Sequence, residues 1–100
     1  MKKYSVKLNQ RAFRDIDDIF NYIAIEISSP ATAKKQTDRI WKALKSLEKF
    51  PYAHQDRIEG KYANKGYKQL LIDKYMAIYR INENDKKVYI ITVIYQGCNI

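Results

Sequence analysis

The chain has 100 residues, a formal net charge of +8 and an apolar fraction of 46%. That length predicts a single domain over residues 1–100, and the apolar fraction argues against disorder. No apolar run approaches the roughly 18 residues needed to span a bilayer. Lys7 and Arg11 leave no continuous apolar segment behind the basic N-terminus. We therefore predict no signal peptide, no membrane partner and a cytoplasmic location.

The charge indicates an anionic partner, either nucleic acid or an acidic protein segment, although a solvated basic surface that confers only solubility would give the same total. Cys98 is the only cysteine and His54 the only histidine, so neither an internal disulfide nor a zinc site is expected. A catalytic pair of Cys98 and His54 is conceivable, but nothing local would activate the thiol. We expect no metal and no cofactor.

Residues 3–8 alternate between polar and apolar side chains, as in a half-buried strand that could join the edge of a sheet. From Gln10 to Ile27 the apolar spacing changes to three and four, which predicts a helix with Asn9 as its N-cap. Its acidic residues Asp15, Asp17 and Asp18 are interpreted as solvated. The predicted buried stripe comprises Ala12, Ile16, Ile19, Ile23 and Ile27, widened by Phe13 and Phe20.

A serine followed by Pro30 predicts a second helix, which runs to about Phe50 and is ended by Pro51. The short join predicts an antiparallel helical hairpin lying across the sheet. The buried positions are predicted to be Ala33, Thr37, Ile40, Trp41, Leu44 and Leu47. One sector of this helix is basic, which indicates either a footprint for an acidic partner or an ordinary solvated face. Its residues are Lys35, Arg39, Lys42 and Lys49.

Residues 52–65 have no clear period, so we predict a loop with a short helical turn near its start. A loop of this length in a compact domain is uncommon unless it has a function. It is our first candidate for a contact region, although it could also be a mobile, lysine-rich connection. The basic side chains that it brings to the start of the sheet are Arg57, Lys61, Lys65 and, directly after it, Lys68.

Residues 66–95 predict three antiparallel strands, the last two joined by a four-residue loop at Asn82–Asp85. The predicted register places Ile81 opposite Lys86, Tyr79 opposite Val88, Ala77 opposite Ile90 and Tyr75 opposite Thr92. The period of two puts Tyr75, Ala77, Tyr79 and Ile81 on one face of the middle strand, and Met76, Ile78 and Arg80 on the other. Neither face is polar, so we expect the helices to cover one. We expect the other to form an apolar groove with a charged edge.

The order strand, helix, helix and three-stranded meander resembles the RelE/ParE superfamily of bacterial type II toxins. The resemblance covers nearly the whole chain. It rests on residues 17–23, 29–33, 47–51, 66–70, 75–81 and 88–90. It implies an α+β fold in which a helical hairpin packs on a twisted antiparallel sheet. It also implies a cognate antitoxin partner with an acidic C-terminal segment, and a toxin that acts on DNA gyrase or on the ribosome and its mRNA.

The chain departs from the mRNA-cutting members of the superfamily at two places. Met76 stands where those members often have an arginine, and the tail from Gln96 to Ile100 lacks their basic pair. Metal-free RNA cleavage needs a base, an acid and a cation for the developing phosphorane charge. The remaining candidates for such chemistry are Arg80, Lys68 and Tyr95, and Arg80 is equally well explained as a partner for an acidic antitoxin side chain.

These departures leave it uncertain whether the protein is an enzyme. They favour a ParE-like toxin that inhibits growth by binding gyrase. A RelE-like, ribosome-dependent endonuclease is the alternative, and a non-toxic remnant that only binds an antitoxin is a third hypothesis. The residues expected to contact a target or an antitoxin are Arg57, Lys61, Lys65, Lys68, Arg80, Lys35, Arg39 and Lys42.

Overall fold

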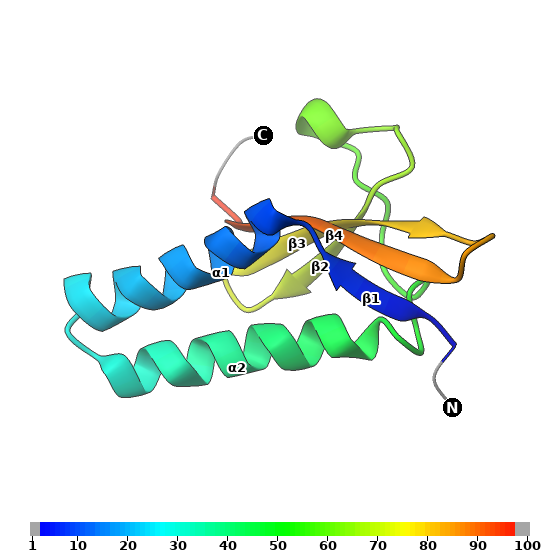
Figure 1. The fold of residues 1–100 in the computed structure, drawn as a ribbon. Coiled ribbons are helices and arrows are strands. Elements are labelled where there is room, and N and C mark those ends of the chain that lie inside the picture. The colour runs from blue at the N-terminus through cyan, green and yellow to red at the C-terminus, as the bar shows by residue number, and fades with distance from the viewer. Residues whose placement is uncertain (1–2, 98–100) are drawn as a thin grey trace.

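A computed structural model describes residues 3–97, and the fold has a helical hairpin on one face of a four-stranded sheet (Figure 1). The strands are β1 (Ser5–Leu8), β2 (Lys68–Ile72), β3 (Tyr75–Asn82) and β4 (Lys87–Tyr95). The helices are α1 (Gln10–Asn21), continued by a π-helical segment (Tyr22–Glu26), and α2 (Pro30–Ser46), with a short 3₁₀ helix at Gly60–Tyr62. No helix within residues 3–97 is long and apolar enough to cross a membrane.

The predicted fold is confirmed, and the structure adds the direction of the first strand. The sheet has the order β1-β4-β3-β2. Strands β2, β3 and β4 are antiparallel, whereas β1 pairs with β4 in parallel. Alternation of side chains determines which residues share a face but carries no information on strand direction, so this pairing could not be predicted from the sequence.

The hairpin between β3 and β4 differs from the predicted register. Asn82 pairs with Lys87, so the loop is residues 83–86, and Tyr79 lies opposite Ile90 instead of Val88. Between the loop and Tyr79, this shift of two residues leaves every side chain on its predicted face. A bulge between Ile78 and Tyr79 on β3 then adds a further residue on β4, and Tyr75 meets Tyr95 rather than Thr92.

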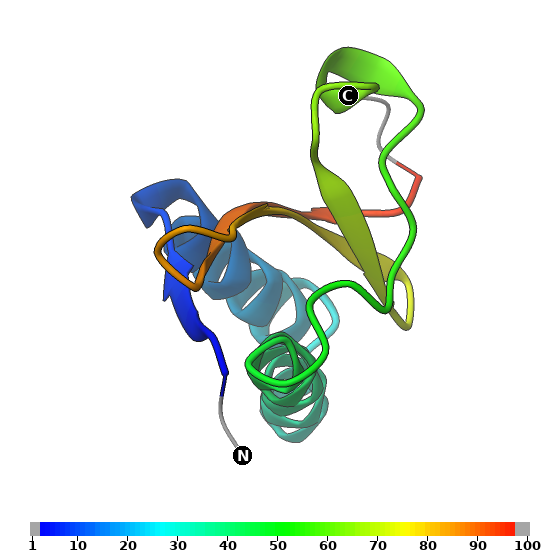
Figure 2. The same ribbon diagram turned by 90° about the vertical axis from the view of Figure 1, so that its right-hand side faces the viewer.

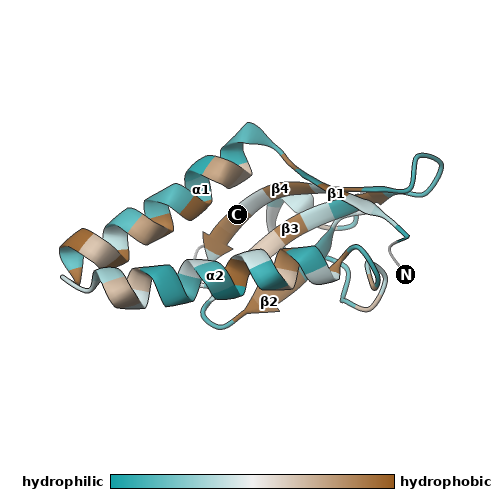
Figure 3. Ribbon diagram, turned by 60° about the horizontal axis from the view of Figure 1, so that its bottom comes forward, coloured by the Kyte–Doolittle hydropathy of each residue, from teal (hydrophilic) through white to brown (hydrophobic). Residues whose placement is uncertain are grey.

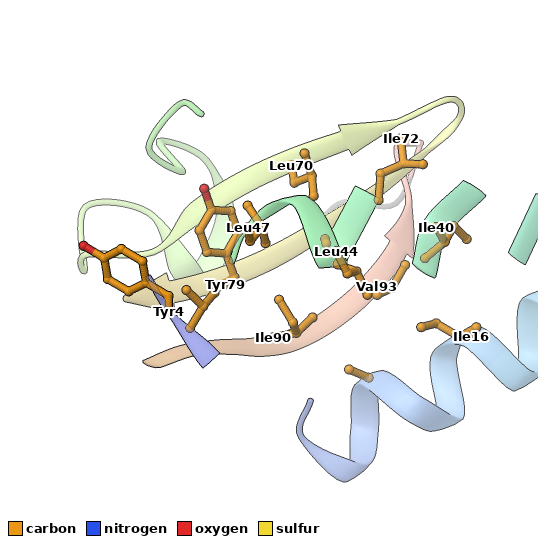
Figure 4. Close-up of a cluster of buried hydrophobic side chains, with 13 residues drawn as sticks. Tyr4, Ile16, Ile40, Leu44, Leu47, Leu70, Ile72, Tyr79, Ile90 and Val93 are labelled. Atoms are coloured by element: carbon orange, nitrogen blue, oxygen red, sulfur yellow. The ribbon is translucent and has the colours of Figure 1, made fainter. Parts of the chain in front are cut away.

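The face of the sheet that meets the helices, here called the inner face, holds the main core. Figure 4 shows Tyr79, Leu70 and Ile90 gathered with Leu44 and Leu47 of the hairpin segment. The Tyr79 hydroxyl donates a 2.5 Å hydrogen bond to the Pro51 carbonyl, and burial raises the pKa of this tyrosine. The face assignment of β3 is thus confirmed for its inner side.

The helical hairpin is displaced along the sheet and extends past one end of it (Figure 1). The join between the two helices lies beyond that end. Apolar and polar residues alternate along both helices, while β2 is largely apolar (Figure 3). The sequence predicted that the apolar stripes of both helices are buried. This prediction was wrong for Phe13, Phe20, Ile27 and Trp41, which are exposed.

Asp15 is a structural link between α1 and β4, not the solvated residue that the sequence suggested. Strand β1 pairs only with the first half of β4, so the second half has no strand on that side. There the Asp15 carboxylate accepts hydrogen bonds from the Thr92 hydroxyl and, at 2.9 Å, from the Val93 amide. It therefore satisfies the strand edge where β1 ends.

Residues 51–67, here called the covering loop, start beside the end of α2 and the inner residue Tyr79 and then pass to the other side of the sheet, which we call the outer face (Figures 1 and 2). Glu83 of the β3–β4 turn anchors the start of this loop. Its carboxylate accepts hydrogen bonds from Lys86, from the Tyr52 hydroxyl at 2.6 Å and from the Tyr4 hydroxyl at 2.8 Å. These bonds lower the pKa of Glu83 to about 2 and raise that of Tyr52 to about 12.

We predict that Asp15→Ala lowers the free energy of unfolding by about 1–3 kcal/mol, because two nearly buried donors lose their acceptor. Urea denaturation of the purified chain measures this value. Asp17→Ala is the matched control on the exposed side of the same helix, and it should change stability by less than about 0.5 kcal/mol. Equal effects of the two substitutions would contradict the proposed link.

The Glu83 cluster predicts a dependence of stability on pH. A carboxyl group whose pKa is lower in the folded chain stabilises it above the unfolded value of 4.5, and this contribution disappears as the pH falls toward 2. The urea midpoint of Glu83→Gln should therefore lie below that of the unsubstituted chain at pH 7, and the two midpoints should converge in acid. Glu59→Gln, at an exposed position, should match the unsubstituted chain at every pH. A gap that persists at low pH would contradict this assignment.

Candidate functional site

The outer face is closed where the sequence predicted an open groove. Met76 is 3% exposed and Ile78 is fully buried, so neither forms an accessible floor. The covering loop pairs with the edge of β2 through a hydrogen bond from the Gln69 amide to the Gln55 carbonyl. The predicted contact region thus covers the predicted groove. Burying the apolar side chains of this face removes them from water and so stabilises the fold.

Arg57 lies inside this closed region instead of on the surface, which corrects the expectation of an exposed contact residue. Its side chain is 8% exposed. Nη1 donates to Gln69 Oε1 at 3.0 Å and lies 3.5 Å from Met76 Sδ. Nε is buried without a hydrogen-bond partner in the described part of the chain.

Arg80 is the exposed cation of the outer face. It lies two residues beyond Ile78 on β3, and its guanidinium carbon is 4.5 Å from the centre of the Tyr89 ring on β4. This stacking holds the planar head group against the sheet and leaves its charge in solvent. The remaining lysines of the covering loop, Lys61 and Lys65, are exposed as predicted.

The ammonium group of Lys68 interacts with two residues of the covering loop. Its ammonium group forms an ion pair with Asp56 at 2.8 Å and donates to the His54 carbonyl at 3.1 Å. Partial burial, and secondarily the charge of Lys68, lower the pKa of His54. Cys98, the other member of the conceivable Cys98–His54 pair, lies outside the described residues, because the structure describes the chain only to residue 97.

The three candidates for RNA chemistry do not come together. Lys68 lies opposite Tyr79, whereas Tyr95 lies opposite Tyr75, which places the two about 13 Å apart along the sheet at 3.3 Å per residue. Arg80 lies on the outer face of the sheet, whereas Tyr75 and its partner Tyr95 lie on the inner face. A general acid or base must reach the reacting atom directly or through one water, and these three side chains do not converge on one such position.

The basic sector of α2 is exposed, but one of its side chains, Arg39, is already paired with an acidic residue. Arg39 makes a two-point contact with Asp73 of the β2–β3 turn, with distances of 2.8 and 2.7 Å. The hydrogen bonds from Arg39, and then from Gln36, lower the pKa of Asp73. Lys35 and Lys42 are exposed on the same sector, as predicted.

A hollow of about 740 Å³ lies where the hairpin extends beyond the sheet, and sequence reasoning missed it. Ile27 on its wall is 56% exposed, and Tyr95 is 50% exposed with its ring edge-on to Tyr75. No local pattern in the sequence could have revealed it, because the hollow depends on where the hairpin is placed along the sheet. The lining residues are Asp18, Ile19, Tyr22, Ile23, Ile27, Thr32, Gln36, Asp73, Lys74, Tyr75 and Tyr95.

Comparisons with solved structures give the same fold. A chain of the chromosomal ParDE toxin–antitoxin system from P. aeruginosa superposes with a TM-score of 0.77 and 21% identity, over 93% of this chain and 96% of that one. A chain of the RelBE2 complex from Mycobacterium tuberculosis gives 0.65 and 18%, over 93% and 98%. The E. coli toxin RelE, as a double arginine-to-alanine mutant in the free state, gives 0.60 and 13%, over 97% and 86%.

Sequence comparison is more specific. A search of curated proteins found no match. The family model described as the ParE toxin of the type II toxin–antitoxin system parDE matches residues 6–99. This match spans nearly the whole chain, from β1 to beyond the end of β4, and the superfamily resemblance noted in the sequence is confirmed. The chain therefore belongs to the ParE toxin family of type II toxin–antitoxin systems.

Proposed function

We propose that this protein is a cytoplasmic toxin that inhibits growth by binding DNA gyrase and that it does not cut RNA. The observation that carries the proposal is the separation of Lys68, Arg80 and Tyr95. Lys68 is paired with Asp56, Arg80 is stacked on Tyr89, and Tyr95 lies at the far end of the sheet. Membership of the ParE family supports the same reading.

A binding toxin needs accessible surface in place of a catalytic cleft, and two surfaces of this chain qualify. One is the basic sector of α2 with Lys35 and Lys42. The other is the outer face around Arg80. Both carry charge that would steer an acidic target surface and increase its rate of association.

We further propose a cognate antitoxin that covers the hollow at the end of the hairpin. Several of the structures that superpose on this chain are toxin–antitoxin complexes. The exposed apolar side chains of Tyr22 and Ile27 would be buried by such a partner. An acidic segment on it would complement the net charge of +8.

The proposal predicts two different outcomes with purified components. Added to gyrase and supercoiled plasmid, the chain should cause cleaved plasmid to accumulate, because a bound toxin would hold the enzyme in its DNA-cleaved state. Added to translating ribosomes, it should leave the mRNA intact, because its candidate groups do not meet. Gel analysis of the plasmid and primer extension on the mRNA provide the two measurements.

Double substitution Lys35→Glu and Lys42→Glu tests whether the basic sector of α2 contributes to the gyrase effect. Arg11→Glu with Arg14→Glu makes the same change of charge at exposed positions of α1, outside both proposed surfaces, and this matched control should leave the gyrase effect unchanged. Cleaved mRNA with intact plasmid would support the endonuclease instead. The absence of both effects, together with normal growth on expression, would identify a non-toxic remnant and overturn the proposal.

A further inference from the structure

The guanidinium group of Arg57 carries a positive charge into the fold without an anionic partner in residues 3–97. The residue is 8% exposed, and the two polar contacts that its side chain makes within the described part of the chain, to Gln69 and Met76, both come from Nη1. The adjacent acidic residue, Asp56, is committed to Lys68. Arginine is almost never fully buried unless it is paired, because a buried cation without a counter-charge is costly.

The unused part of the head group has a defined chemical shape. Among residues 3–97, Nε has no hydrogen-bond partner and Nη2 makes no hydrogen bond. The Nε and Nη2 protons point in parallel from one edge of the guanidinium plane and match the two oxygens of a carboxylate. A ligand on this edge would supply both the missing acceptor and the missing charge.

We propose that the Nε–Nη2 edge of Arg57 is a receptor for one carboxylate side chain of an acidic protein partner. This inference rests on the proposed function only in naming that partner as the antitoxin. A glutamate carboxylate on a flexible side chain can enter a narrow site. A nucleic-acid phosphate sits on a bulky backbone and is better served by an exposed cation such as Arg80.

A ligand can reach Nε of Arg57 only if the covering loop moves, because Nε itself is not in contact with solvent. Next to Arg57 the loop is held by two backbone hydrogen bonds, from the Arg57 amide to the Tyr67 carbonyl and from the Asn64 amide to the Arg57 carbonyl. Its regular structure consists of the three-residue helix at Gly60–Tyr62 and one β-bridge between Asp56 and Lys68. A segment with few internal hydrogen bonds opens at a lower free-energy cost than the sheet below it.

The test follows the Nε–Hε resonance of Arg57 by NMR in the isotopically labelled full chain. The probes are formate, inorganic phosphate and a capped tripeptide with one central glutamate, each compared with chloride at equal ionic strength. Formate and the glutamate peptide should shift the Arg57 signal with saturation. The same tripeptide with glutamine should not shift it. The Arg80 Nε–Hε signal serves as the internal control for non-specific anion effects.

Arg57→Met supplies the second measurement, because it removes the charge while keeping a flexible side chain. We expect an unchanged or higher urea midpoint for the free protein, since replacing a buried cation with an apolar group is often stabilising. We also expect binding of the glutamate peptide to weaken about tenfold or more, from the loss of a charge-assisted bidentate contact. Arg80→Met is the matched control and should leave the urea midpoint unchanged.

Three results would overturn the inference. No saturable shift at Arg57, or equal shifts at Arg57 and Arg80, would mean that the edge is satisfied by water or by the fold alone. A clear preference for phosphate over the glutamate peptide would assign the site to a nucleic acid. A lower urea midpoint with unchanged peptide binding in Arg57→Met would assign Arg57 to structure. None of these results bears on gyrase, so the proposed function would stand or fall separately.

Discussion

Burial of β3 on both faces is the constraint on which the rest of this structure depends. Its inner side chains Ala77 and Tyr79 pack under the helical hairpin, and its outer side chains Met76 and Ile78 lie under the covering loop. A central strand that is apolar on both sides needs two covers, because each exposed apolar face would lower stability. The hairpin supplies one cover as a rigid layer. The loop supplies the other with little regular structure of its own.

The two covers have different consequences for function. The hairpin extends past one end of the sheet, so it leaves an apolar hollow beside Ile27 and Tyr95 that suits a protein partner. The loop closes the face on which a nuclease would need an open groove, and it buries Arg57 in doing so. What remains exposed on that face is Arg80, supported by Tyr89. Surface suited to binding is therefore present, while a convergent set of catalytic groups is not.

Much of the fold could be predicted because alternation and helical periodicity report directly on burial. They located four strands and two helices and assigned the faces of β3 correctly. Other features depend on contacts between distant segments that no local pattern encodes. These are the parallel pairing of β1, the bulge opposite Tyr79, and the Asp15 contact with β4. Next to the loop, the hairpin register was wrong by two residues because such a shift preserves every face and leaves the pattern unchanged.

The candidate site was less predictable than the fold. Charge in the sequence indicated Arg57, Lys68 and Arg39 as surface contacts, yet the structure buries the first and pairs the other two with Asp56 and Asp73. Composition counts charges but does not reveal their partners. Lys35, Lys42, Lys61, Lys65 and Arg80 remain exposed where they were predicted, and their binding roles stay predictions.

The central claim is that the outer face of β3 is closed by the covering loop, and the oxidation of Met76 by dilute peroxide tests it most directly. Mass spectrometry of the peptide that contains Met76 can follow the reaction in the folded chain and in urea. A buried thioether is protected from solvent oxidant, so the account predicts much slower oxidation in the folded chain. A rate in the folded chain close to that in urea would mean that Met76 lines an open groove, and it would contradict the account.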